Sequence, residues 1–398
     1  MNSPYPHVHK DWVIIGGGIH GVHVAARLIG EVGLARDRLC IVDPGDQLLD
    51  RWRTCTAQTG MTFLRSPSVH HLGLSPWSLE KFAGKKSKRP KGLFARPYNR
   101  PSLALFNAHC DRVIEDLGLD ACHLRARVTD AAIVDDDVTM RLSDGRTLHA
   151  DRVVLAIGGG EHPELPSWMP THDSRAQHIF AESFNGWPIE HEAVVVVGGG
   201  ISAGQVALRL ASEGQDVHLI CRHPFRKHQF DSDAGWLGPK FMRGFQQEPS
   251  ASARRAMITR ARHRGSMPPD VVRDVKHAIH TGMIAHHQAD VDRLTADPTS
   301  LHLTLTNGVS IPADRVLLAT GFRGSRPGGT LIDGLITSAS LPCASCGFPL
   351  VDTSLRWHPK VFVTGPLAEL ELGPTSRNIA GARRAADRMV HALRAESL

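Results

Sequence analysis

A chain of 398 residues is long enough for two or three folded domains. With 41% hydrophobic and 22% charged residues, its composition is that of a globular protein and excludes a disordered or collagen-like one. Seven scattered cysteines favour a reducing compartment, and no signal peptide or apolar run near ~20 residues occurs, so we expect a cytoplasmic protein without a membrane partner. The net charge of +6 comes without a nucleic-acid-binding motif, so we expect no nucleic-acid partner.

The first predicted element is a short buried strand over residues 11–15, which leads into a glycine-rich turn and a helix over 22–29. Gly16, Gly18 and Gly21 permit a tight bend and let a pyrophosphate approach the backbone, while the helix amino terminus offers free N–H donors. The next strand, residues 38–42, is followed by Asp43, whose carboxylate can accept hydrogen bonds from ribose hydroxyls. This pattern predicts a dinucleotide site for a ribose without a 2′-phosphate.

The segment that follows holds a basic cluster and an amphipathic helix. Residues 103–117 place apolar side chains at helical spacing just behind Pro101, which predicts a helix that faces the core. The basic cluster at 85–91, like a second one at 254–264, lacks an accompanying aromatic ladder. We interpret both clusters as solvated loop or helix faces.

The chain then repeats its own pattern. Residues 141–158 form a hairpin signal and an apolar strand that ends in glycine, and residues 305–321 do the same. Between them lies a second strand, glycine turn and helix, over residues 193–211. The repetition predicts an α/β protein with two Rossmann-like dinucleotide-binding domains.

The second glycine turn differs from the first in ways that bear on its ligand. Its three slots are Gly198, Gly200 and Ala203, and its next strand, residues 216–221, ends without an acid and is followed by Arg222. A missing carboxylate beside an arginine suits a 2′-phosphate, because an acid would repel the phosphate and a guanidinium pairs with it. We therefore predict NADPH rather than NADH at this turn.

The end of the chain returns to the first pattern. Residues 360–365 form one more apolar strand that ends at Gly365, and residues 377–393 carry apolar side chains at helical spacing. We place both on the first sheet. The predicted organisation is a FAD domain in two parts, residues 1–162 and 322–398, with the NADPH domain, residues 163–321, inserted into it.

The paired turns and the late strand ending at Gly365 resemble the two-dinucleotide-binding-domain flavoproteins, in which the first turn holds FAD and the second NAD(P)H. The Gly200-x-Ser202-Ala203 variant is similar to that of the class B flavin monooxygenases, which include ornithine and lysine N-hydroxylases, Baeyer–Villiger enzymes and flavin-containing monooxygenases. The segment 61–65, followed by 99–101 and a long helix, further resembles the N-hydroxylases. A complete Baeyer–Villiger signature is missing before the second turn, which weakens that assignment.

The resemblance implies roles for individual residues. Thr375 and Ser376 would place a helix amino terminus near the pyrimidine edge of the flavin, where it stabilises the negative charge of reduction. Arg65 is a candidate for binding a substrate carboxylate, and Gln58 and Asn378 are the other catalytic candidates. The implied cofactor sites are Gly16, Gly18, Gly21, Asp43, Gly365, Thr375 and Ser376 for FAD, and Gly198, Gly200, Ser202, Ala203 and Arg222 for NADPH.

We expect a flavoprotein that oxidises NADPH with bound FAD, and specifically a monooxygenase of the N-hydroxylase type that uses oxygen on a small amine or other soft nucleophile. Cys343 and Cys346 have redox spacing, so an NADPH-dependent thiol/disulfide reductase is the alternative, and a non-catalytic dinucleotide sensor is another. The 24 histidines show no metal-ligand spacing, so we predict no metal site.

Overall fold

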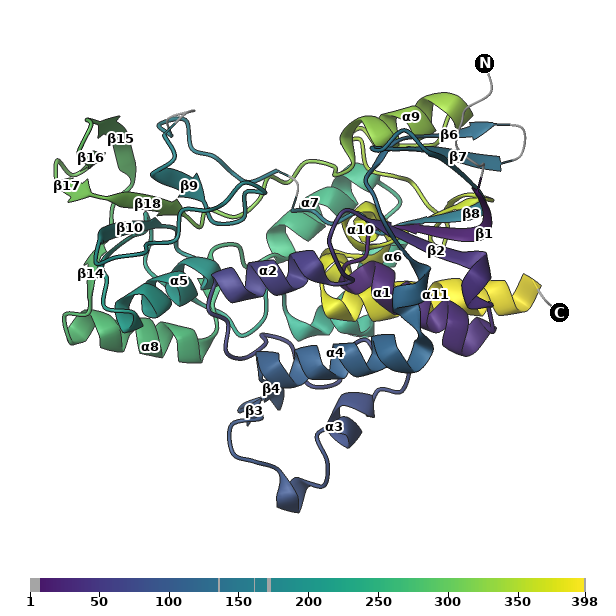
Figure 1. Cartoon of the computed structure of the whole chain (residues 1–398), viewed down its shortest axis with the longest axis horizontal. Coiled ribbons are helices and arrows are strands. Elements are labelled where there is room, and N and C mark those ends of the chain that lie inside the picture. Colours follow the sequence, from purple (N-terminus) through teal and green to yellow (C-terminus); the bar gives the residue numbers. More distant parts are fainter. Residues whose placement is uncertain (1–7, 135–136, 161, 170–172, 397–398) are drawn as a thin grey trace.

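The computed structural model describes residues 8–134, 137–160, 162–169 and 173–396, which form two parallel-stranded units (Figure 1). The first sheet has the strand order β19-β20-β8-β1-β2-β5, and β7 and β6 extend it from β8. Its strands are β1 (Val8–Ile15), β2 (Leu39–Asp43), β5 (His123–Arg125), β6 (Val128–Val134), β7 (Asp137–Leu142), β8 (Thr147–Leu155), β19 (Arg356–His358) and β20 (Val361–Val363).

The second sheet has five parallel strands in the order β14-β11-β10-β18-β9. They are β9 (Ala176–His178), β10 (Ala193–Val197), β11 (Asp216–Ile220), β14 (Ile284–His287) and β18 (Arg315–Leu318). The smaller sheets pair β15 (Val291–Ala296), β16 (Leu301–Leu305) and β17 (Ser310–Ala313); β3 (Phe94–Ala95) with β4 (Arg100–Pro101); and β12 (Arg226–Lys227) with β13 (Ser266–Met267).

The α-helices lie between these strands along the chain, with the last two after the final strand. They are α1 (Ile19–Arg27), α2 (Asp50–Gln58), α3 (Ser78–Phe82), α4 (Leu103–Leu117), α5 (Ile201–Ser212), α6 (Pro239–Gln247), α7 (Ala251–Ala261), α8 (Pro269–His280), α9 (Gly329–Ala339), α10 (Glu369–Leu372) and α11 (Ile379–Glu396). In the first unit α1 packs against α11 and α4, while α9 packs against β6 (Figure 1). No helix of the described residues is long and apolar enough to cross a bilayer.

The apolar run of β10 shows why the second sheet is covered on both faces. Val194 and Val196 are fully buried against residues of α5 and α8, whereas Val195 and Val197 pack against the sheet of β15, β16 and β17. A strand buried on both faces needs apolar residues at every position, because its side chains alternate between the faces. The continuous run of residues 193–197 is therefore the mark of a central parallel strand.

The predicted repeat is confirmed in the backbone. Gly16 N donates to Val42 O, and Gly198 N donates to Ile220 O, each at 2.9 Å. The two units differ after the hairpin: β8 runs unbroken into the parallel sheet, whereas in the second unit the chain breaks into β17 and β18 at Asp314. The predicted class, two Rossmann-like domains in an α/β chain, is confirmed.

The insertion is visible in the order of the strands. The second sheet uses residues 176–318, and the first sheet takes strands from both sides of that stretch. The exact boundaries at 162 and 321 stay a prediction. Both glycine-turn helices begin earlier than expected, directly after Gly18 and Gly200, and the last helix begins at Ile379, after a 3-10 turn over Pro374–Arg377.

Candidate cofactor and substrate site

The first glycine turn is shaped by close contacts that only glycine permits. Gly16 has a φ of +112°, and a Cβ there would lie 2.6 Å from the carbonyl oxygen of Ala156. A Cβ on Gly21 would lie 1.8 Å from the carbonyl oxygen of Gly16, whereas one on Gly18 would meet nothing within 4 Å. No side chain caps α1 and its first turn holds no acid, so its amino-terminal N–H groups suit a phosphate.

Asp43 lies beside this turn, at the end of β2. Its two carboxylate oxygens accept hydrogen bonds from Gly17 N at 2.6 Å and from Gly45 N at 2.9 Å. These bonds fix the carboxylate, and a carboxylate has further lone pairs for ribose hydroxyls. The arrangement fits the predicted ribose contact.

The second glycine turn has similar geometry, but the third glycine of the first turn is replaced by alanine. Gly198 has a φ of +154°, and a Cβ there would lie 2.5 Å from the carbonyl oxygen of Ala319. Gly200 precedes α5 without any side-chain cap, and Ser202 lies half-buried in the first turn of that helix. Ala203 is fully buried, so the helix start accommodates a methyl group here.

Arg222 follows the strand next to this turn. It is exposed, and within the described residues it makes no hydrogen bond or ion pair. The neighbouring His223 lies close to the turn, because a Cβ on Gly199 would lie 2.9 Å from its ring. An unpaired guanidinium near a phosphate-binding turn can pair with a 2′-phosphate.

A cavity of about 610 Å³ lies where several distant parts of the chain meet. Its wall takes residues from the first turn, from segment 61–70, from segment 230–237 of the insert and from segment 375–380 before and within α11. Most of the wall is apolar, and its polar members include Arg65, Asp231, Arg377 and Asn378. Three predicted site residues therefore meet at this cavity: Arg65, Thr375 and Asn378.

The other predicted residues lie outside the cavity wall. Gln58 ends α2, where its backbone carbonyl accepts a hydrogen bond from Arg209 at 3.3 Å. Ser376 is fully buried, and its hydroxyl donates to the carbonyl oxygen of Gly365 at 2.5 Å. Gly365 has a φ of +63° and lies against the ring of His20. Ser376 thus holds the backbone that borders the first turn.

Arg65 joins the two units. Its guanidinium donates to the carbonyl oxygens of Gln229 at 2.7 Å and His228 at 2.8 Å, and to the hydroxyl of Ser266 at 2.9 Å. All three acceptors are neutral, and burial lowers the pKa of Arg65. The side chain therefore fixes the insert against segment 61–70 while its positive charge stays at the cavity.

A buried carboxylate holds the other cation of the cavity wall. Glu369 is fully buried and accepts two hydrogen bonds from Arg377, at 2.8 and 3.0 Å. Arg255 also donates to Glu369, and an Arg262 nitrogen lies 3.9 Å from its carboxylate. Burial opposes ionisation, but Arg377 and the other two arginines hold the pKa of Glu369 below its usual range.

These contacts correct the interpretation of the second basic cluster as a solvated helix face. Arg255 and Arg262 face Glu369, and Arg254 pairs with Glu371 at 3.3 Å. The partners come from α10, more than a hundred residues later. The cluster therefore joins α7 of the insert to the segment that borders the cavity.

Sequence reasoning missed two groups at the site. His20 lies inside the first turn, where its Nδ1 is 2.8 Å from the hydroxyl of Thr364. Burial lowers the pKa of His20 to about 4, despite backbone contacts with Arg377 and Asn378. Its place within the glycine motif could have indicated it. Asp231, whose carboxylate accepts a hydrogen bond from Asn378 at 3.0 Å, carries no local sequence signal.

The two cysteines of the redox spacing lie away from the cavity wall. The backbones of Cys343 and Pro349 form an isolated antiparallel β-bridge. Between them, Gly347 N donates to the carbonyl oxygen of Ala344 at 2.8 Å, which closes a tight turn. Phe348 of this turn packs beneath Arg255 of α7. Both thiols are free, Cys346 is exposed, and burial raises the pKa of Cys343.

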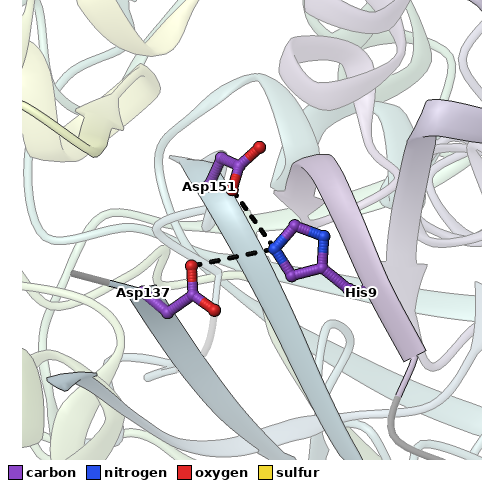
Figure 2. Close-up of side chains that lie close together, drawn as sticks. All are labelled: His9, Asp137 and Asp151. Carbon is purple, nitrogen blue, oxygen red and sulfur yellow. Dashed lines mark ion pairs between the residues drawn. The ribbon is translucent and has the colours of Figure 1, made fainter. Parts of the chain in front are cut away.

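One group of possible metal ligands occurs in the described part of the chain. His9 Nε2 lies 3.2 Å from a carboxylate oxygen of Asp151 and 3.7 Å from one of Asp137 (Figure 2). The three side chains come from β1, β8 and β7, and His9 lies near the start of β1, whereas the glycine turn follows its end. They are exposed or half-exposed and already pair with one another. The absence of a metal site stays a prediction.

Two family models match the chain. An FAD-NAD(P)-binding model matches residues 13–160, and a pyridine nucleotide-disulphide oxidoreductase model matches residues 126–237. No curated protein sequence gives a significant match.

Solved structures of three flavoproteins share the fold at low sequence identity. Ornithine hydroxylase PvdA from Pseudomonas aeruginosa is 16% identical with a TM-score of 0.76, and the match covers 98% of this chain and 100% of that one. Ornithine N-hydroxylase KtzI from Kutzneria sp. 744 is 16% identical with a TM-score of 0.78, covering 99% and 100%. Bacillithiol disulfide reductase Bdr from Bacillus cereus is 17% identical with a TM-score of 0.62, covering 98% and 99%.

The two turns, the sheet order and the family models define an FAD/NAD(P)-binding flavoprotein oxidoreductase. The predicted resemblance to the two-dinucleotide-binding-domain flavoproteins is confirmed. The monooxygenases and the disulfide reductases share this fold, so the reaction has to be argued from the site.

Proposed function

We propose that the chain is an FAD-dependent monooxygenase that oxidises NADPH and hydroxylates a small amine or other soft nucleophile, as the ornithine N-hydroxylases do. The observation that carries this proposal is the cavity, because it joins the first turn, segment 61–70 and the start of α11 in one largely apolar space. The structural likeness to two ornithine hydroxylases supports it.

The residues present fit the cofactors. The backbone of Gly16, Gly18 and Gly21 would receive the FAD pyrophosphate, Asp43 its ribose, and the Gly365 and Thr375–Ser376 backbone its flavin end. The NADPH site would be formed by Gly198, Gly200, Ser202, Ala203 and Arg222. Bound FAD would supply the redox chemistry, accepting a hydride and activating oxygen.

The side chains of the cavity would orient the substrate and exclude water. Apolar residues such as Leu64 and Ile379 keep the space dry, which monooxygenase chemistry requires. Asn378 is fixed by its hydrogen bond to Asp231, and Arg65 brings a positive charge that suits an anionic group of the substrate. The use of oxygen, the preference for NADPH and the amine substrate are all parts of this proposal.

The disulfide-reductase alternative needs a dithiol at the cavity. Cys343 and Cys346 are free and share one turn, but that turn packs against α7 and contributes nothing to the described cavity wall. A monooxygenase has no need of these thiols. Their replacement therefore separates the two reactions.

The test compares the purified wild type with the double variant C343S/C346S. We expect both proteins to be yellow, and NADPH to bleach the flavin without air much faster than NADH does. Both should then consume oxygen with NADPH and form hydroxylated product from a panel of small amines. Loss of NADPH oxidation in the double variant, together with disulfide-dependent turnover of the wild type, would contradict the proposal.

A further inference from the structure

One segment, residues 75–98, has a large excess of cations over acids, and we call it the basic excursion. It holds a single acid, Glu80, and seven cations, which are Lys81, Lys85, Lys86, Lys88, Arg89, Lys91 and Arg96. Its net charge of +6 equals the formal net charge of the entire chain. The other residues of the chain are therefore neutral in sum, although they include the second basic cluster at 254–264.

The single acid of the basic excursion is already used to anchor it. The Glu80 carboxylate accepts hydrogen bonds from Ser68 at 2.8 Å and Asn99 at 2.7 Å. Arg89 turns inward and donates to the carbonyl oxygens of Gly84 and Glu80, at 2.9 and 2.7 Å. An Arg89 nitrogen also lies 3.7 Å from the Glu80 carboxylate. These contacts fix the base of the excursion and pair its single acid with Arg89 rather than with a lysine.

The lysines are exposed and unpaired. The side-chain ammonium groups of all five have no hydrogen-bond or ion-pair partner among the residues that the structure describes: Lys81, Lys85, Lys86, Lys88 and Lys91. The excursion, which includes α3, projects away from both sheets on the far side of α4 (Figure 1). Five ammonium groups therefore face solvent at a protruding part of the molecule.

Exposed aromatic side chains occur in the same segment. Trp77 is 58% exposed, Tyr98 55% and Phe82 43%, and they are the aromatic members among the exposed large hydrophobic residues of the described chain. An open hollow of about 470 Å³ brings Trp77 together with Lys81, Lys85, Lys86, Arg89 and the single acid, Glu80. Aromatic rings beside cations are typical of surfaces that meet a lipid headgroup layer.

We infer that the basic excursion docks on an anionic lipid surface, which departs from the expectation, drawn from the sequence, of no membrane partner. Clustered lysines are attracted by the negative surface potential, while Trp and Phe side chains favour the boundary between headgroups and acyl chains. The three rings are spread over the excursion, since Phe82 lies against His109 and Tyr98 against Phe230. A broad surface matches this spread better than a nucleic-acid strand, which needs rings in a row along a groove.

The position of Tyr98 connects this surface to the cavity. Tyr98 belongs to the excursion and also lines the cavity, where its ring lies 5.0 Å from that of Phe230. A lipid surface held by the excursion would therefore lie near one wall of the cavity. The docking itself does not depend on the reaction proposed above.

The test uses the full-length holoprotein and flotation with vesicles of phosphatidylcholine, either alone or with a third of phosphatidylglycerol. We expect the wild type to float with anionic vesicles, not with neutral ones, and to be released by high salt. The variant K85E/K86E/K88E should bind at least a hundredfold more weakly. The control variant R273E/K276E/R293E, which reverses three exposed cations elsewhere, should bind like the wild type.

A second measurement keeps the test independent of the folding of the triple variant. W77S/F82S should lose most vesicle binding while keeping its far-UV spectrum and flavin content. The inference is wrong if the wild type does not bind anionic vesicles at low salt, or if the two triple variants bind them equally well. It is also wrong if a single-stranded oligonucleotide binds more tightly than the vesicles with the same dependence on Lys85 and Lys86, because the surface would then serve nucleic acid.

Discussion

Three buried histidines make the stability of the first unit sensitive to acid. His23, His71 and His109 are each at most 3% exposed, and they lie around the guanidinium of Arg383. Burial and the nearby Arg383 charge lower the pKa of His23 and of His71 to about 3, and that of His109 to about 4. The hydrogen bonds confirm that the rings are fixed: His23 Nδ1 lies 2.9 Å from Leu72 O, and His109 Nε2 lies 2.5 Å from the Ser78 hydroxyl.

The sign of the effect follows from the lowered pKa. In the unfolded chain a histidine has a pKa of about 6.5, so between pH 6.5 and 4 it binds a proton only when the protein is unfolded. Stability is therefore complete above about pH 6.5 and falls as the pH falls toward the folded-state pKa. Between pH 7 and pH 5, each of the three rings lowers the free energy of unfolding by about 2 kcal/mol, and the three together lower it by about 6 kcal/mol. That loss is comparable to the whole stability of many proteins.

The assay is denaturant unfolding at pH 7, 6 and 5, followed by far-UV circular dichroism, on the wild type and on His109→Gln. The variant keeps a polar side chain but removes one titrating ring, so its loss of stability between pH 7 and pH 5 should be smaller by about 2 kcal/mol. His280→Gln, which changes an exposed histidine at the end of α8, is the control for the substitution itself. Equal pH dependence in all three proteins would refute the reasoning.

Three further predictions concern the cofactor turns and the buried carboxylate. Gly21→Ala places a Cβ 1.8 Å from the carbonyl oxygen of Gly16, so the purified protein should lose its flavin, whereas Gly18→Ala, with open space, should still fold, as absorption spectra and circular dichroism will show. Arg222→Ser should raise the KM for NADPH at least tenfold and leave that for NADH unchanged; an equal rise for both would contradict its role. Glu369→Ala leaves three arginines without their shared partner and should cost about 3–5 kcal/mol in denaturant unfolding; a loss below 1 kcal/mol would contradict the buried network.

The fold could be predicted because its signals are local. The run of residues 193–197 and the glycine turn after it lie within a dozen positions, and both describe one strand, one turn and one helix start. The helix starts differ from the prediction for a physical reason: Gly18 and Gly200 are each both the last residue of the turn and the N-cap, so the helices begin directly after them. Periodicity of apolar residues cannot mark such a start.

The site could be predicted only in part, because its wall is assembled from distant segments. The turns and Asp43 are predicted from spacing within one strand–turn–helix unit, and the structure places the Asp43 carboxylate against the backbone of the first turn. Asp231 and Phe230 reach the cavity because the insert folds back on segment 61–70, and the Arg65 hydrogen bonds fix this approach across more than 160 residues. No local pattern around residue 230 indicates that contact.

The two basic clusters show how the same residue types acquire opposite roles. Both clusters are rich in Lys or Arg and poor in acids, and the sequence predicts a solvated face for each. Arg255 and Arg262 are half-buried against Glu369, which is fully buried and needs cations to stay ionised. The second cluster therefore joins the insert to α10. In the basic excursion the only carboxylate, Glu80, pairs with Arg89 at 3.7 Å and accepts hydrogen bonds from Ser68 and Asn99, so the lysines keep no acidic partner in the described residues. What distinguishes the clusters is therefore the supply of acids from elsewhere in the chain, and a charge excess that the fold leaves unpaired is the one that can act on a partner.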